Sequence, residues 1–241
     1  MKSESKEKIS NFVNESDFML PGEKRFFSEE RKKGNYDSRY NDKLSLLDVA
    51  AIQGDQDVMD TLINEADINV NSTNKHGTTA LHQAANYGNA DVVYDLINEY
   101  DAEFIKKTAL TQDTPLDSAI KGAIKGTDTI NVVKELLKND FSESHSKEEY
   151  ERKFDKSQVS EASETFELIE EYNTLEKVFE TVLSSLAPEE LSEKAALEIA
   201  NTIAKSSNKD FLSDTILDRL NDRYLQLYPE QTKNITTNYS K

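Results

Sequence analysis

The chain has 241 residues, enough for one or two domains, and its 46 acidic side chains outnumber its 29 basic ones to give a net charge of −17. This charge repels phosphate backbones, so it argues against nucleic acid and anionic membranes as partners and favours a basic protein partner or simply solubility. The chain contains no cysteine, which excludes disulfides, thiolate nucleophiles and cysteine-based zinc sites.

The sequence predicts neither a membrane span nor a secretory signal. No apolar run approaches the roughly 18 residues of a membrane helix. The first residues, MKSESKEKIS, are charged and lack the apolar core of a signal peptide. We therefore expect the protein to be cytoplasmic, or to be exported by a route that needs no N-terminal signal.

Residues 1–40 are expected to form an N-terminal helical cap or arm. Ile9, Phe12 and Val13 recur at helical spacing, and a second short helix is predicted from Pro21 to the residues before Gly34. This segment carries nine basic and eight acidic side chains, unlike the acidic remainder of the chain. A peptide-like docking arm and a partly disordered leader are the alternatives.

The clearest pattern of the chain lies in residues 74–99, NKHGTTALHQAANYGNADVVYDLINE. Gly77 can adopt the positive φ of a tight turn, and Thr79 is placed to cap a helix. Leu81 and the alanines after it form an apolar stripe at helical spacing, and Gly88 ends this helix as a left-handed cap. A second helix with an apolar face follows, so the pattern predicts a turn and two antiparallel helices.

A single unit of this kind cannot bury its own apolar face, so neighbouring copies are expected. Leu47 lies 34 residues before Leu81 in a matching segment, and Leu116 lies 35 residues after it in another. The third copy is irregular, with Gln112 in place of the turn glycine. It also has five more residues between its two apolar stripes than the second copy. Either its first helix is longer, or a loop is inserted.

The segment GTTALHQAANYGNADVVYDLI resembles the ankyrin-repeat pattern G-x-T-P-L-H-x-A-A-x-x-G-x-x-x-V-V-x-x-L-L and departs from it at Ala80, where the family has proline. The resemblance implies an all-α fold in which residues 41–141 form a short ankyrin-repeat solenoid, with repeats at about 41–73, 74–107 and 108–141. A C-terminal α-helical bundle or extension would follow. The resemblance implies that His82 bonds the backbone of a neighbouring repeat, and the outer copies carry Asp48 and Asp117 at this position. Structural roles are implied for Gly77, Thr79, Leu81, His82 and Gly88.

The remainder of the chain is expected to contain a charged linker or helix (142–159), a region of three helices (160–228) and a polar tail (229–241). Apolar residues repeat every three or four positions along the first of these helices, which is typical of a heptad seam, and further apolar residues widen the seam beyond a coiled-coil stripe. We expect a monomer, with a dimer through residues 168–186 as the alternative. The seam consists of Leu168, Tyr172, Leu175, Phe179, Val182 and Leu186.

No motif in the sequence indicates catalysis. An HExxH helix, a glycine-rich phosphate loop and a G-x-S-x-G elbow are all missing, so we predict no enzymatic activity, no cofactor and no metal site. Besides His82, the sequence has two histidines. His76 is expected at an exposed turn where it could contact a partner, and His145 is expected to be solvated in a charged linker.

The resemblance places the partner-binding surface on the concave side of the repeats, which consists of the loop tips and the exposed face of each first helix. Tyr87 is the first candidate anchor, because exposed aromatic residues dominate interface energetics, and Ile52 is the second. The alternative is that the N-terminal arm or the C-terminal bundle covers this surface. The matching positions are Asp42, Leu44, Ile52 and Gln53 in the first repeat, Thr73, Lys75, His76, Thr78, Asn86 and Tyr87 in the second, and Thr111, Asp113 and Lys121 in the third.

The function predicted from the sequence is that of a non-enzymatic protein–protein interaction module that binds a protein partner through its concave surface. The composition, rich in lysine, asparagine and isoleucine and free of cysteine, resembles that of secreted ankyrin effectors of intracellular bacteria. One alternative is an adaptor whose C-terminal helices recruit a second protein, such as a ubiquitin-ligase subunit. The other, less favoured, is an enzyme that uses the repeats as a substrate arm.

Overall fold

The computed structural model describes residues 1–139 and 145–185, and these residues are helical, with no strand among them. The chain divides into two compact units, Met1–Phe166 and Glu167–Lys241. The last described helix, α11 (Ser163–Ser185), runs from the first unit into the second. The two later helices predicted up to residue 228 and the polar tail lie outside the described residues.

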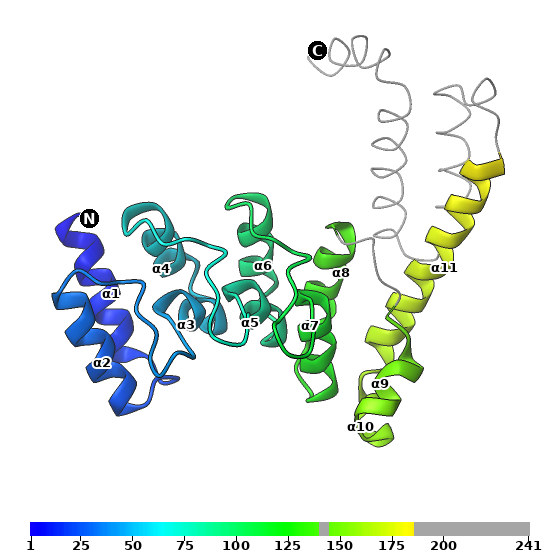
Figure 1. The fold of residues 1–241 in the computed structure, drawn as a ribbon, viewed down its shortest axis with the longest axis horizontal. Coiled ribbons are helices and arrows are strands. Elements are labelled where there is room, and N and C mark those ends of the chain that lie inside the picture. Colours follow the sequence, from blue (N-terminus) through cyan, green and yellow to red (C-terminus); the bar gives the residue numbers. More distant parts are fainter. Residues whose placement is uncertain (140–144, 186–241) are drawn as a thin grey trace, which may run out of the picture. The chain divides into compact units, whose positions relative to one another are not determined.

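Three successive helix pairs lie side by side in the first unit (Figure 1). Helix α5 contacts both α3 and α7, and α6 contacts both α4 and α8. The first helices of the pairs therefore form an inner row and the second helices an outer row. The pairs are α3 (Leu46–Gln53) with α4 (Gln56–Asp60), which continues as the π-helical turn η1 (Thr61–Glu65); α5 (Ala80–Asn86) with α6 (Ala90–Asn98); and α7 (Pro115–Ile124) with α8 (Ile130–Asn139).

Each inner helix begins with the same reciprocal cap. The side-chain oxygen of the cap residue accepts a hydrogen bond from the N–H of the third helical residue, and the side chain of that residue accepts one from the N–H of the cap. These contacts satisfy donors that the start of a helix otherwise leaves without partners. The pairs are Ser45 with Asp48, Thr79 with His82, and Thr114 with Asp117.

Buried apolar side chains hold the rows together. The three leucines that define the repeat spacing, Leu47, Leu81 and Leu116, are all buried, and each such burial contributes about 1.5–3 kcal/mol. Small side chains between the inner helices allow the helix backbones to approach closely. These are the fully buried alanines Ala50, Ala84 and Ala119.

A loop precedes each inner helix, and one main-chain hydrogen bond closes each loop. In the first loop (40–44) the N–H of Tyr40 donates to the carbonyl of Leu44 (2.8 Å). The second loop (74–78) and the third loop (108–113) are closed in the same way, over 3.1 and 2.9 Å. The second and third loops are joined by a bond from the N–H of Ala109 to the carbonyl of His76 (2.7 Å). The loops therefore form a linked edge beside the inner helices.

The third repeat differs from the second in both of the ways that its sequence allowed. Helix α7 has 10 residues, whereas α5 has 7. The connection to the outer helix also lengthens, from residues 87–89 in the second repeat to residues 125–129 in the third. At the turn, Gln112 has a φ of 56°, so it takes the left-handed conformation that Gly77 (φ 77°) takes in the second loop.

Two N-terminal helices flank the first repeat. Helix α1 (Ser3–Glu15) contacts α2 (Pro21–Lys32) on one side and α4 and η1 on the other. Ile9 and Val13 of α1 are completely buried, and the hydroxyl of Ser5 donates to Glu65 at the end of η1 (2.7 Å). We propose that this pair caps the array, because it covers apolar surface of the first repeat that no earlier repeat covers.

Two short helices, α9 (Lys147–Lys153) and α10 (Lys156–Glu161), flank the third repeat, and α10 packs against α7. His145 lies just before α9, is only 5% exposed, and places its Nε2 3.4 Å from Oδ1 of Asp117. The expectation that His145 is solvated was therefore wrong, because this carboxylate lies 28 positions away in the sequence but beside it in the fold.

The described part of the predicted heptad seam lies in α11. Leu168 and Tyr172 are both buried, at 2% exposure, as a seam requires. The side chains of the later seam positions lie outside those that the structure describes, so the predicted helical bundle and the alternative dimer remain predictions.

Candidate functional site

A groove of about 390 Å³ lies between the second and third loops on the inner-helix side of the array. Two loops and two inner helices form its walls, so side chains from two neighbouring repeats face one space. Ten of its eleven lining residues have polar side chains, and the remaining one is the strongly exposed Leu110. Its lining residues are His76, Thr78, His82, Gln83, Asn86, Thr108, Leu110, Thr111, Asp113, Ser118 and Lys121.

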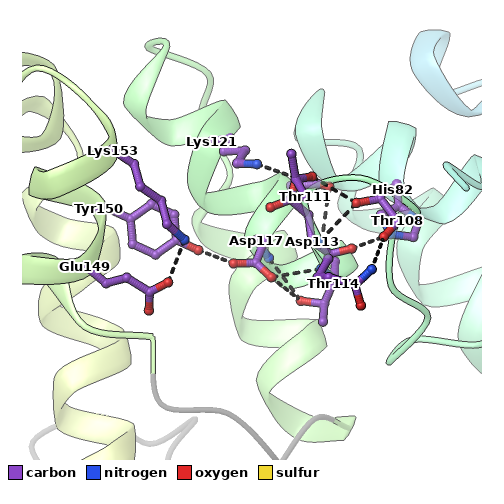
Figure 2. A network of polar contacts seen from close by, with 12 residues as sticks. His82, Thr108, Thr111, Asp113, Thr114, Asp117, Lys121, Glu149, Tyr150 and Lys153 are labelled. Atoms are coloured by element: carbon purple, nitrogen blue, oxygen red, sulfur yellow. Dashed lines mark hydrogen bonds and ion pairs between the residues drawn. The ribbon is translucent and has the colours of Figure 1, made fainter. Parts of the chain in front are cut away.

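A network of polar contacts around Asp113 fixes the third loop (Figure 2). The carbonyl of Asp113 accepts from the N–H of Thr108 (2.9 Å), and its own N–H donates to the hydroxyl of Thr108 (3.0 Å). The carboxylate of Asp113 accepts from the hydroxyl of Thr111 and from the ammonium of Lys121. Since Lys121 is paired in this way, the opposite charges of Asp113 and Lys121 offset each other in the lining of the groove, although the chain as a whole is acidic.

His82 connects the second repeat to this network (Figure 2). Its Nε2 lies 3.1 Å from the carbonyl oxygen of Asp113, and its Nδ1 lies 3.3 Å from the N–H of Thr79. A carbonyl can only accept, so Nε2 carries the proton and Nδ1 is the acceptor, which is the neutral imidazole. Burial lowers the pKa of His82 below its usual 6.5. This cross-repeat contact is the one that the family resemblance implies for the position.

Asp117 occupies the same position in the third repeat and contacts the C-terminal flank (Figure 2). One carboxylate oxygen accepts from the N–H of Thr114 (2.8 Å), and the other accepts from the hydroxyl of Tyr150 and lies near His145. Burial by itself would raise the pKa of Asp117, but the hydrogen bonds from His145 and Tyr150 outweigh it and hold the pKa well below its usual value. Burial also raises the pKa of Tyr150, and the adjacent carboxylate raises it further.

The groove contains six of the thirteen residues that the sequence predicted as partner-binding. They come from both loops and both inner helices, and none of them is buried. The other exposed or half-buried candidates lie outside the lining of the groove: Asp42, Leu44, Gln53, Thr73, Lys75 and Tyr87. The six groove residues are His76, Thr78, Asn86, Thr111, Asp113 and Lys121.

Ile52 was predicted as an exposed anchor, and this prediction was wrong, because Ile52 is only 7% exposed. The segment between α1 and α2 reaches this end of the inner row. The hydroxyl of Ser16 donates to the side chain of Gln53 (2.7 Å), and the ring of Phe18 meets that of Tyr87 edge-on, with 6.0 Å between centroids. The N-terminal segment therefore contacts one end of the concave surface, and Tyr87, although 43% exposed, has an intramolecular partner.

Four residues that line the groove were not among the predicted ones: Gln83, Thr108, Leu110 and Ser118. Leu110 is 79% exposed, more than any other large apolar side chain reported for the described part of the chain. A leucine in the loop KKTALTQD, where the small Ala109 is the only other apolar residue, was a signal that could have identified it. Gln83 and Ser118 each follow the third helical residue of their inner helix, so the repeat register could have identified both.

Residues 46–147 match the family model described as ankyrin repeats, in three copies. This part of the chain is an ankyrin-repeat array. The match covers the three helix pairs of the structure and ends at the first residue of α9. A search of curated proteins found no match to the chain.

Ankyrin repeats indicate a protein–protein interaction module, and proteins of this family bind protein partners and are typically non-catalytic. Among the described residues, no cluster of histidine and acidic side chains could hold a metal ion. Within the same part of the chain, no helix has the length and apolar character needed to cross a membrane.

Proposed function

We propose that the chain binds a protein partner through the groove between its second and third ankyrin repeats. The observation that carries the proposal is the convergence of both loops and both inner helices on one space of about 390 Å³. This space presents hydrogen-bonding side chains around a single strongly exposed leucine, Leu110. Apolar anchors surrounded by polar contacts are typical of binding sites on proteins.

The groove is suited to a partner segment that brings one apolar side chain against Leu110 and hydrogen-bonding groups to the inner helices. Asn86 and Gln83 offer amide donors and acceptors, and Lys121 is held in place by Asp113. Because the third loop is fixed by its internal bonds, the groove loses little conformational entropy on binding. The net charge of −17 favours a partner with basic side chains around this contact.

The experiment compares two substitutions that each replace an exposed apolar side chain by arginine. Leu110→Arg changes the groove, whereas Tyr94→Arg changes a side chain of the outer helix α6 that is 48% exposed. Intact protein and both variants, shown by circular dichroism to be folded, serve as baits in quantitative pull-downs. We expect the Leu110 variant to capture at least about tenfold less partner, which corresponds to a loss of roughly 1.4 kcal/mol in binding free energy, and the Tyr94 variant to capture as much as the intact protein.

Retention of every partner by the Leu110→Arg variant would show that the groove is not the binding site. Equal loss with both variants would indicate a general effect of the added positive charge. A partner found in this way is then purified, and its dissociation constants for the three proteins are measured by calorimetry.

A role as a secreted effector is supported by composition alone. We propose it as the cellular setting of the same binding activity, either in the cytoplasm of the producing cell or in a host cell. Fractionation of an infected culture tests it, since an exported protein would be recovered outside the producing cells.

A further inference from the structure

A second concavity, of about 640 Å³, lies at the N-terminal end of the array. Helix α1, the C-terminal end of α2 and the end of η1 form its walls, all within the first unit. It is separate from the groove, with which it shares no lining residue. We call it the basic pocket, and its charged side chains are Lys6, Arg31, Lys32, Lys33 and Glu65.

The basic pocket concentrates positive charge on a chain that is otherwise acidic. Four of its five charged side chains are cationic, whereas the chain carries −17. Lys33 is paired with Glu30 (2.6 Å), but Lys6, Arg31 and Lys32 form no ion pair with any residue that the structure describes. The carboxylate of Glu65 already accepts bonds from the hydroxyl of Ser5 and the N–H of Lys2. Solubility does not explain this cluster, because the rest of the surface already supplies a large net charge.

Arg31 is positioned by the fold and is incompletely satisfied by it. Its Nη1 donates to the carbonyl of Lys6 (3.0 Å), which links α2 to α1 and orients the guanidinium at the pocket wall. Its Nε is buried and has no hydrogen-bond partner, the only side-chain nitrogen or oxygen of this kind reported for the described residues. A buried cationic donor without an acceptor is unfavourable, and an anion beside the guanidinium would offset the lost solvation.

We propose that the basic pocket binds a small molecule that carries phosphate groups. Guanidinium and ammonium groups that converge on one concavity are the usual means of binding phosphate, with arginine supplying the planar fork and lysines the point charges. The volume lies in the range of small-molecule sites, roughly 300–1,000 Å³. A small ligand fits better than a membrane or a nucleic acid, since the acidic remainder of the molecule repels large polyanionic surfaces.

The test uses the full chain, with inorganic pyrophosphate as the probe and isothermal titration calorimetry at low salt as the measurement. Lys6→Gln/Lys32→Gln removes two exposed charges of the pocket, and Lys43→Gln/Lys125→Gln removes two exposed charges elsewhere. All three proteins are first shown by thermal melting to be folded. We expect saturable one-to-one binding that weakens at least about tenfold in the pocket variant and less than about twofold in the control.

Absence of saturable binding to the intact chain would overturn the proposal, as would equal weakening in both variants, which is the result expected of non-specific charge attraction. A parallel arm measures flotation with vesicles that contain a phosphorylated lipid. Binding to vesicles without binding to pyrophosphate would identify a membrane contact in place of a small-molecule site and would also overturn the proposal. The ankyrin groove is unchanged in both variants, so its partner binding is an independent readout.

Discussion

Gly88 and Gly126 end the inner helices of the second and third repeats, with φ angles of 78° and 85°. An alanine at either position would have to adopt this left-handed conformation, at a cost of about 1–2 kcal/mol. Only at Gly88 would the added Cβ also meet backbone, at 2.2 Å from the carbonyl oxygen of Asp128, whereas nothing lies within 4 Å at Gly126. The two glycines therefore share a conformational role but differ in packing.

We predict that Gly126→Ala lowers the free energy of unfolding by about 1–2 kcal/mol and that Gly88→Ala lowers it considerably more. Urea denaturation followed by circular dichroism measures both values. Equal losses would mean that the chain around Asp128 shifts freely, and would contradict the close packing of the third repeat against the second.

His82 predicts a pH dependence of stability. Its pKa is lowered in the folded protein, so the unfolded chain binds a proton more readily once the pH falls below about 6.5. The contribution of the neutral imidazole is thus present above that value and is lost as the pH falls. A His82→Gln variant keeps a side chain that can complete the cap, but it does not titrate.

Between about pH 7.5 and about pH 5.5, we expect the intact protein to lose more stability than the His82→Gln variant, by at most about 1.4 kcal/mol per pH unit. Chemical denaturation at several pH values measures the difference. Parallel curves for the two proteins would show that another group, and not His82, responds to pH in this range.

At the scale of elements, the third residue of each inner helix joins its repeat to the next element of the fold. In the first repeat, Asp48 holds the guanidinium of Arg39, which donates to the hydroxyl of Ser72 beside the second loop (3.1 Å). His82 bonds the third loop directly, and Asp117 accepts from Tyr150 in the C-terminal flank. The residue at this position is therefore histidine where the neighbouring group is a carbonyl acceptor, and aspartate where the neighbouring group is a hydrogen-bond donor.

The contact between Asp117 and Tyr150 is predicted to stabilise the docking of α9 and α10 on the third repeat. Tyr150→Phe should cost about 1.5–3 kcal/mol, the usual contribution of a hydrogen bond to a charged group. Asp117→Ala should cost more, because it also removes the cap of α7, which contributes about 1 kcal/mol. A double-mutant cycle should give a coupling energy of about 1–3 kcal/mol, and additive losses would contradict direct coupling.

Since the pKa of Asp117 lies below the unfolded value of about 3.9, this coupling should be fully present above that pH and should be lost only in stronger acid.

The repeat pattern allowed the array to be predicted, because its evidence is local: Leu47, Leu81 and Leu116 at a fixed spacing, with caps and turns around them. The two wrong predictions, for Ile52 and for His145, have a different physical origin. Ile52 and His145 are buried at two different places where segments distant in the sequence meet, and a single sequence does not indicate such contacts. The basic pocket is partly of the same kind, since it joins the consecutive residues Arg31, Lys32 and Lys33 to Lys6, 25 positions before them, and to Glu65, 32 positions after them.

At the scale of the whole molecule, the charge of −17 opposes the association of identical copies. We therefore predict a monomer, with a mass near 27.3 kDa by light scattering at two protein concentrations. A mass about twice as large that rises with concentration would instead support the alternative dimer through residues 168–186. Repeating the measurement at high salt shows whether charge repulsion is what keeps the protein monomeric, because salt screens the repulsion between copies.

The two concavities also give the molecule two surfaces of different electrostatic character. The groove between the ankyrin repeats is close to neutral, whereas the basic pocket is cationic. They lie at different places along the array and share no lining residue. A protein partner and a phosphate-bearing molecule could therefore be bound at the same time without competing for side chains.

The link made by His82 bears on how an array of this kind can lengthen by gene duplication. Its acceptor is a main-chain carbonyl, which a further repeat would supply whatever side chain it carried at that position. Asp117, in contrast, requires the hydroxyl of Tyr150. If residues 74–107 were duplicated in tandem, the histidine at this position in each copy would face a main-chain carbonyl of the next repeat. A copy placed after the third repeat would instead separate Asp117 from Tyr150. Evolution could add repeats in the middle of this protein more easily than at its end.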